Sequence, residues 1–190
     1  MKKLIILVPE GDNNLSSITG AYEIFNKANE YWLKNHHEKI FQIKLAGISE
    51  SVDFNNGLFV VKPHLNISDI TKADLIIIPS LNHNYNLALK GNESLIPWLK
   101  HQYKNGSEIA TICSGAFMLA ATGLVDGKNC STHWSVSEAF KLLFPNVHLK
   151  TDSIVTDENG IYTNGGAYSF LNLIIYLIEK YFDRQTAIYC

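Results

Sequence analysis

Runs of apolar residues alternate along this chain with stretches whose apolar residues recur at helical spacing. Residues 4–8 and 74–79 are apolar at nearly every position, which is typical of strands buried on both faces of a parallel sheet. Helical spacing predicts a helix over 18–33, and alternation at 41–46 predicts a strand nearer a sheet edge. Further helices are expected at 92–104, at 117–121, from 135 up to Pro145, and at 168–182.

Two short hairpins are inserted into this pattern. The first lies at 52–61 around an Asn-Asn-Gly turn, and the second at 153–163 around Asn159 and Gly160. Asn-Gly pairs accept the positive φ angles that tight hairpin turns need. The remaining alternation of strands and helices predicts an α/β fold, with a mainly parallel sheet covered by helices on both faces.

The stretch 107–123 joins a predicted strand to a helical run through Cys113, Ser114 and Gly115. A nucleophilic side chain at a sharp strand-to-helix turn is the arrangement of a nucleophile elbow, and its neighbours are small because the backbone turns tightly. The helix dipole and amides can lower the pKa of such a thiol from about 8.5 to roughly 3.5–7.5. The alternative is a core cysteine, because free Cys is among the most buried residue types.

Other polar residues also follow predicted strands. Ligands of parallel sheets bind beyond the carboxyl ends of the strands, so Cys113, Ser80 and the loop 10–17 should converge there. No metal site is expected, because the histidines apart from His133 show no ligand spacing on a shared face. These are His36, His37, His64, His83, His101 and His148.

Composition narrows the class of protein. The 190 residues, 46% hydrophobic and 18% charged, suit one folded domain, or one domain with a fragment of another. A net charge of −2 gives no electrostatic footprint for nucleic acid. Cys113, Cys130 and Cys190 have no CxxC spacing and an odd count, which suggests neither a zinc site nor a disulfide framework. The apolar runs are too short for a signal peptide or a membrane span, so we expect a cytoplasmic protein without membrane contact.

Four segments together resemble the ThiJ/PfpI superfamily, which has a flavodoxin-like three-layer sandwich of the class I glutamine amidotransferase type. ATICSGAFMLAATGLVDG, at 110–127, resembles the cysteine elbow with its helix and turn, and ADLIIIPS, at 73–80, resembles the third-strand segment. CSTHWSVSEAFKLLFPNV, at 130–147, resembles the threonine-histidine-tryptophan stretch, and residues 152–179 resemble the closing hairpin, glycine pair and helix. The residues around the elbow and in the threonine-histidine-tryptophan stretch are similar to those in the sensor domain of AraC-type transcription regulators.

This resemblance implies that effector binding and DNA binding belong to different domains. Residues 1–183 would form the sensor domain, and 184–190 would begin a linker or helix toward a C-terminal helix-turn-helix domain absent from this chain. A small-molecule effector would bind over Cys113, DNA would bind through the missing domain, and the regulator would act as a homodimer. We expect no cofactor. The apolar helix at 168–182 also predicts a dimer, because a helix apolar on most faces is either central or covered by another subunit.

Catalysis in this superfamily generally needs an acid near the thiol, three residues before the glycine that opens the first helix. Gly20 matches that glycine, which puts Ser17 in the place of the acid. A hydroxyl cannot exchange a proton at neutral pH as a carboxylate does, so the pattern favours binding over catalysis. Glu10 and Asp12 lie in the same loop, although nothing in the pattern directs them to the sulfur.

His133 is the candidate base for the thiol, against a purely structural role beside Trp134. Gly165 and Gly166 could approach a ligand through their amides or simply form the turn into the last helix, where Asn164 and Tyr168 stand beside them. The predicted ligand pocket contains Ser17, Ser80, Cys113, Ser114, His133, Gly165 and Gly166.

Two other functions remain open from the sequence. An intact elbow also suits a stand-alone enzyme with Cys113 as nucleophile, such as a hydratase, an amidase or a glyoxalase-like lyase. A weaker interpretation is redox sensing, in which an accessible thiol of low pKa is oxidised.

Overall fold

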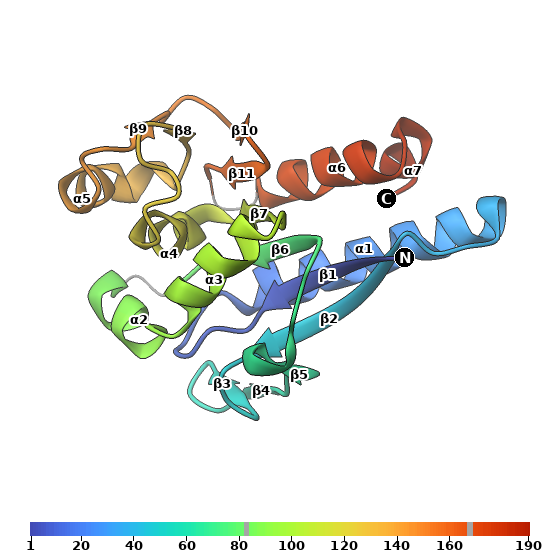
Figure 1. Cartoon of the computed structure of the whole chain (residues 1–190), viewed down its shortest axis with the longest axis horizontal. Helices are drawn as coiled ribbons and strands as arrows, with labels where there is room; N and C mark the ends of the chain where they lie inside the picture. Colours follow the sequence, from blue (N-terminus) through green and yellow to red (C-terminus); the bar gives the residue numbers. More distant parts are fainter. Residues whose placement is uncertain (82–83, 167–168) are drawn as a thin grey trace.

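The structure, a computed structural model, describes residues 1–81, 84–166 and 169–190, and in it a central sheet lies between two layers of helices (Figure 1). Within these residues the sheet has seven strands, in the order β10-β11-β7-β6-β1-β2-β5. Their bounds are β1 Lys2–Leu7, β2 Phe41–Gly47, β5 Leu65–Asn66, β6 Leu75–Ile78, β7 Glu108–Thr111, β10 Val155–Glu158 and β11 Ile161–Asn164. Every neighbouring pair is parallel except β10–β11, which confirms the predicted fold class.

The helices cover the sheet in two groups. α1, α6 and α7 lie on one face, and α2, α3 and α4 lie on the other, with α5 beyond α4 (Figure 1). Their bounds are α1 Leu15–His36, α2 Tyr85–Gly91, α3 Leu95–Lys104, α4 Ala116–Ala121, α5 Ser137–Leu143, α6 Phe170–Tyr181 and α7 Arg184–Tyr189. Among the described residues, no helix combines the length and the apolar character that crossing a membrane requires.

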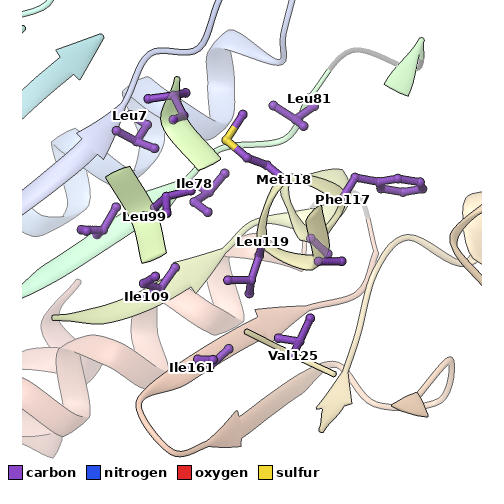
Figure 2. Packing of buried hydrophobic residues seen from close by; sticks show 14 of the residues in the cluster. Leu7, Ile78, Leu81, Leu99, Ile109, Phe117, Met118, Leu119, Val125 and Ile161 are labelled. Carbon is purple, nitrogen blue, oxygen red and sulfur yellow. The ribbon is translucent and has the colours of Figure 1, made fainter. Parts of the chain in front are cut away.

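The central strands are apolar at successive positions because both of their faces are covered. On β1, Ile5 and Leu7 pack into the layer of α3 and α4, while Leu4 and Ile6 pack against α1 and α6. Figure 2 shows the first of these layers, in which Met118 and Leu119 of α4 lie among side chains of the strands. Strand side chains alternate between faces, so an unbroken apolar run is what two buried faces require.

Both predicted hairpins are present. The first joins β3 Val52–Phe54 to β4 Phe59–Val61, and the second joins β10 to β11. Asn159 and Gly160 have φ angles of 55° and 74°, the left-handed backbone that a two-residue turn needs. The strand predicted near an edge is β2, whose only outer neighbour is the two-residue β5.

The predicted helix start at Ser135 is wrong. A 3-10 turn, Trp134–Val136, comes first, and α5 begins at Ser137, whose hydroxyl donates to the carbonyl of Trp134. Several short elements were also missed: α2, the two-residue edge strand β5, and a parallel pair of two-residue strands, β8 Asn129–Cys130 and β9 His148–Leu149.

The position of α6 explains its composition. Phe170, Leu173, Ile174, Leu177 and Ile178 are buried between the sheet, α1 and α7, so the helix is central rather than exposed. Its apolar faces consequently give no argument for a dimer. The predicted helix at 168–182 began at Tyr168, which lies outside the described residues, and α6 begins at Phe170.

The last helix, α7, packs back onto α1. The carboxylate of Asp183 accepts a hydrogen bond from the amide of Thr186 and caps the helix N-terminus, and the ring of Tyr189 stacks on that of Tyr31. Figure 1 shows α7 returning over the far end of α1. Residues 184–189 thus contribute side chains to the same core as the rest of the chain.

Candidate functional site

The turn after β7 has the geometry of an elbow. Cys113 has a φ of 52°, a strained left-handed backbone for a residue with a side chain, and it opens a 3-10 turn, Cys113–Gly115, that leads into α4. A Cβ on Gly115 would stand 2.6 Å from the carbonyl oxygen of Pro79 and 2.8 Å from that of Ile78. The expected need for a small neighbour is confirmed, because α4 starts in direct contact with the end of β6.

Two side chains hold the backbone of Cys113. Its N–H donates to Oδ1 of Asn164 at 3.0 Å, and its carbonyl accepts from Oγ1 of Thr132 at 3.0 Å. Nδ2 of Asn164 in turn donates to Oγ of Ser169 at 2.8 Å. The strained residue is therefore fixed from β11 on one side and from the 130–133 segment on the other. The sequence gave Thr132 no role, and its place beside His133 was the only available signal.

The thiol of Cys113 is buried, with 8% of the residue exposed. Burial raises its pKa, and hydrogen bonds from Ser80 and Ser114 act in the opposite direction without cancelling the effect. This shift is opposite to the lowering that an elbow can produce, and burial of the thiol is what the alternative of a core cysteine implies. Desolvation of the thiolate is the largest of the causes that act on this pKa.

The two serine hydroxyls beside the sulfur form a hydrogen bond with each other. Oγ of Ser80 and Oγ of Ser114 are 2.9 Å apart, and Oγ of Ser114 donates to the carbonyl of Leu81 at 2.9 Å. Each hydroxyl has one proton to donate. Both hydroxyls also lower the pKa of the thiol, so each divides its hydrogen bonding between the sulfur and another oxygen, which limits the stabilisation that they give to a thiolate. This arrangement suits a neutral thiol.

Ser17 joins the loop after β1 to the end of β6. Its hydroxyl donates to the carbonyl of Asn14 at 2.7 Å and accepts from the amide of Ser80 at 3.1 Å, and only 2% of the residue is exposed. The predicted meeting of the ends of β1, β6 and β7 is thus present as a chain of hydrogen bonds from Ser17 through Ser80 to Ser114. The hydroxyl of Ser17 holds two loops together and carries no acid.

His133 does not contact the thiol. Its Nδ1 accepts from the amide of Ser135 at 3.2 Å and lies 2.6 Å from Oγ of Ser135, and its ring stacks on Trp134. Within the described residues, no hydrogen bond joins His133 to Cys113. The structural role is the one that these contacts support.

The acidic residues of the loop after β1 also point elsewhere. Oδ1 of Asp12 accepts from the amide of Asn55 at 2.8 Å, which ties the loop to the first hairpin. Glu10 lines a cavity against α2. Neither is among the groups that shift the pKa of the Cys113 thiol.

Gly165 and Gly166 form a crowded turn. A Cβ on Gly165 would stand 2.5 Å from Oγ of Ser131, and its N–H donates to the carbonyl of Ile154 at 3.0 Å. Gly166 has a φ of 97°. Both residues line a small cavity of about 110 Å³ beside Trp134, so the turn role explains the two glycines and leaves the amide of Gly165 already used.

Tyr85 of α2 is a neighbour of the thiol that the sequence did not indicate. Its ring stacks on Phe117 at 3.8 Å, and its pKa is raised to about 12 by burial and by the charge of a Cys113 thiolate. His83, two residues earlier, lies outside the described residues. Across the part of the chain that the structure describes, no group of three or more His, Cys, Asp or Glu side chains could hold a metal ion.

Comparison with known proteins agrees with this geometry. The model of the DJ-1/PfpI family matches residues 5–180. The chain belongs to the DJ-1/PfpI family. This confirms the resemblance to the ThiJ/PfpI superfamily, and the fold and the elbow at Cys113 are as that resemblance implies.

DJ-1/PfpI relatives of this chain include regulators and an enzyme. This chain is 30% identical over 92 residues to the HTH-type transcriptional regulator GbdR of Pseudomonas aeruginosa. The match covers 48% of this chain but only 25% of that regulator. The chain is 25% identical over 128 residues to the isonitrile hydratase of Pseudomonas putida, covering 67% of this chain and 54% of the enzyme. A putative transcriptional regulator protein from Vibrio parahaemolyticus has the same fold, with a TM-score of 0.86, 23% identity, and coverage of 98% of this chain and 95% of that one.

Proposed function

We propose that this chain forms the ligand-sensing part of an AraC-type transcription regulator, working in the cytoplasm. The observation that carries the proposal is Ser17: where an acid would serve catalysis, a hydroxyl joins Asn14 to Ser80. The similarity to GbdR supports the same conclusion. An elbow without its acid, and with a neutral thiol, is suited to holding a ligand rather than to attacking one.

The mechanism is a shift between two arrangements of the regulator. An effector bound over Cys113 would contact Ser80, Ser114 and the turn at Gly165, which come from three different strand ends. To change DNA binding, it must bind one arrangement more tightly than the other. Since this chain carries a net charge of only −2, the DNA-binding surface belongs to a separate helix-turn-helix domain.

Reading the gene beyond the codon for Cys190 tests the regulator directly. We expect a coding sequence with paired helix-turn-helix units, and we expect the complete product to retard DNA from upstream of its own gene in a mobility-shift assay. A stop codon immediately after Cys190 would refute the proposal, and so would a complete product that does not bind DNA.

The regulator is further proposed to be a homodimer. The support comes from the first hairpin, where Leu58, Phe59 and Val60 are consecutive, apolar and exposed, with 72% of Leu58 accessible. Contiguous exposed apolar residues mark interaction surfaces. Sedimentation velocity is expected to give a dimer that Phe59→Asp converts to a monomer, and a wild-type monomer at high micromolar concentration would contradict this.

A stand-alone enzyme is the second candidate, because the elbow is intact and the chain is similar to an isonitrile hydratase. The regulator interpretation predicts slow alkylation of Cys113 by iodoacetamide at pH 7, with a rate that still increases beyond pH 9 instead of levelling off, since burial raises the pKa of the thiol above its ordinary value. Peptide mass spectrometry measures the rate, with Cys130, whose pKa is raised to about 12, as the internal reference.

Fast alkylation at pH 7, together with turnover of isonitriles or α-oxoaldehydes that Cys113→Ala abolishes, would establish the enzyme instead. Redox sensing is tested on the same samples, because it requires mild peroxide to oxidise Cys113 ahead of Cys190, which is more exposed.

A further inference from the structure

A carboxylate without a donor lies outside the elbow. Oε1 of Glu10 is buried and has no hydrogen-bond partner in the described part of the chain. Glu10 also takes part in none of the ion pairs found there. A buried carboxylate oxygen without a donor is costly, and a rotation of the carboxylate that turns this oxygen toward a donor from outside the chain would remove that cost.

The backbone around this carboxylate is held firmly. The amide of Glu10 donates to Oδ1 of Asn92 at 2.8 Å, and its carbonyl accepts from Nδ2 of Asn92 at 3.1 Å and from Nδ2 of Asn13 at 3.2 Å. Asn92 is fully buried at the end of α2. These bonds fix the loop after β1 beside α2, so the carboxylate is presented from a rigid position.

A cavity of about 230 Å³ lies at this place. Its apolar wall is made by Leu87 and Ala88 of α2, and Gly91 leaves room, since a Cβ there would stand 4.0 Å from that of Glu10. The lining residues are Glu10, Gly11, Asn84, Leu87, Ala88 and Gly91. Glu10 is their only acidic member, and no residue predicted for the pocket over Cys113 is among them.

We propose that this cavity binds a small protonated amine. Its ammonium group donates to the Glu10 carboxylate, and a short aliphatic body packs on Leu87 and Ala88. Charge-assisted hydrogen bonds to a carboxylate are strong, and the positive charge matches Glu10, the one acidic side chain among the described lining residues. Ca²⁺ and Mg²⁺ fit poorly, because they need about six oxygen ligands or more. The inference does not depend on the regulator proposal, because the site uses other residues.

The test uses n-butylamine, with 1-butanol and butyrate as the matched neutral and anionic probes, in calorimetric titrations at pH 7. We expect saturable binding of n-butylamine alone. Glu10→Gln should weaken this binding at least tenfold. The matched control is Glu93→Gln, which changes an exposed glutamate between α2 and α3 and should leave the binding unchanged. In ¹H–¹⁵N spectra the amide signals of Gly11, Ala88 and Gly91 should shift on titration.

Equal affinity of the wild-type and Glu10→Gln chains would overturn the proposal. Equal binding of 1-butanol, shifts centred on Cys113, or no binding of n-butylamine would do the same. Gly91→Val keeps the carboxylate but fills the cavity and is also expected to lose binding. If a lowered melting temperature shows that Glu10→Gln is misfolded, the Gly91→Val variant tests the amine site in its place.

Discussion

At the scale of single residues, hydroxyl groups rather than charges organise the elbow. Ser17, Ser80 and Ser114 form one connected set of donors and acceptors, and each proton in it already has an acceptor. The thiol at the end of this set is buried, and its pKa is raised by that burial. A site of this kind recognises polar groups of a ligand by exchanging one hydrogen-bond partner for another.

Replacing Ser17 by Ala removes a donor to the carbonyl of Asn14 and an acceptor for the amide of Ser80. Because the buried amide of Ser80 is then left without its acceptor, we expect the free energy of unfolding to fall by about 1–3 kcal/mol. Urea unfolding followed by circular dichroism measures the change.

Ser16→Ala is the matched control, because Ser16 is exposed and has no hydrogen bond from its side chain within the described residues. If both variants were equally stable, Ser17 would not join the two loops as described.

At the scale of elements, the close contact of α4 with the end of β6 sets the position of the elbow. No side chain fits at Gly115, where two backbone carbonyls lie within 3 Å of the place a Cβ would take. The hydrogen bonds from Asn164 and Thr132 then hold the same turn from the opposite side. The elbow is therefore located by backbone packing before any ligand arrives.

Gly115→Ala should push α4 away from β6. The new methyl group meets backbone, which cannot turn aside as a side chain would, so we expect a loss of about 1–3 kcal/mol of stability. Gly91→Ala, in which the added Cβ has ordinary space, should leave the stability unchanged or raise it slightly. Thermal unfolding of the two variants makes the comparison, and equal melting temperatures would contradict it.

At the scale of the whole molecule, one edge of the sheet contains a hydrogen-bond acceptor that can titrate. Nδ1 of His64 accepts from the amide of Leu45 on β2 at 3.0 Å. Burial, with the charge of Lys44 as a second cause, lowers the pKa of this histidine below its ordinary value of 6.5. The folded chain therefore holds His64 neutral at a pH where the unfolded chain already binds the proton.

Stability is consequently expected to fall as the pH decreases through 6.5, because the unfolded state then takes up more protons than the folded state. His64→Asn keeps an acceptor near the same place without titrating, so its stability should vary less between pH 7.5 and 5.5. Urea midpoints at several pH values test this, with the exposed His148→Asn as control. A wild-type midpoint that does not change over this range would refute it.

The sequence was sufficient for the long elements and insufficient for the short ones. Runs such as 4–8 carry a clear signal because both faces are buried, whereas β8 and β9, with two residues each, have no period to detect. The start of α5 was misplaced because the side chain of His133 caps the turn before it. That contact, like the proximity of Tyr85 to the thiol, exists only once the chain is folded.

The same limit applies to the site. The elbow follows from its small residues and from the strand before it, so Cys113 and Gly115 were found. The rise in the thiol pKa was not predicted, because it depends on how much water the folded chain removes from around the sulfur. The burial of α6 shows the same effect, since an apolar helix looks alike in sequence whether its cover is the same chain or another.

The hydrogen bonds of Ser17 also bear on how such a chain could change over evolution. Placing a carboxylate at position 17 takes one substitution, but an ionised carboxylate only accepts hydrogen bonds, so the carbonyl of Asn14 would keep the amide of Ser17 as a donor, lose the hydroxyl and face a negative charge. A lineage that gained an acid there would first pass through a less stable protein. A second change in the loop 10–16 would have to come before it or with it, so a catalytic acid is harder to introduce at this position than a single replacement suggests.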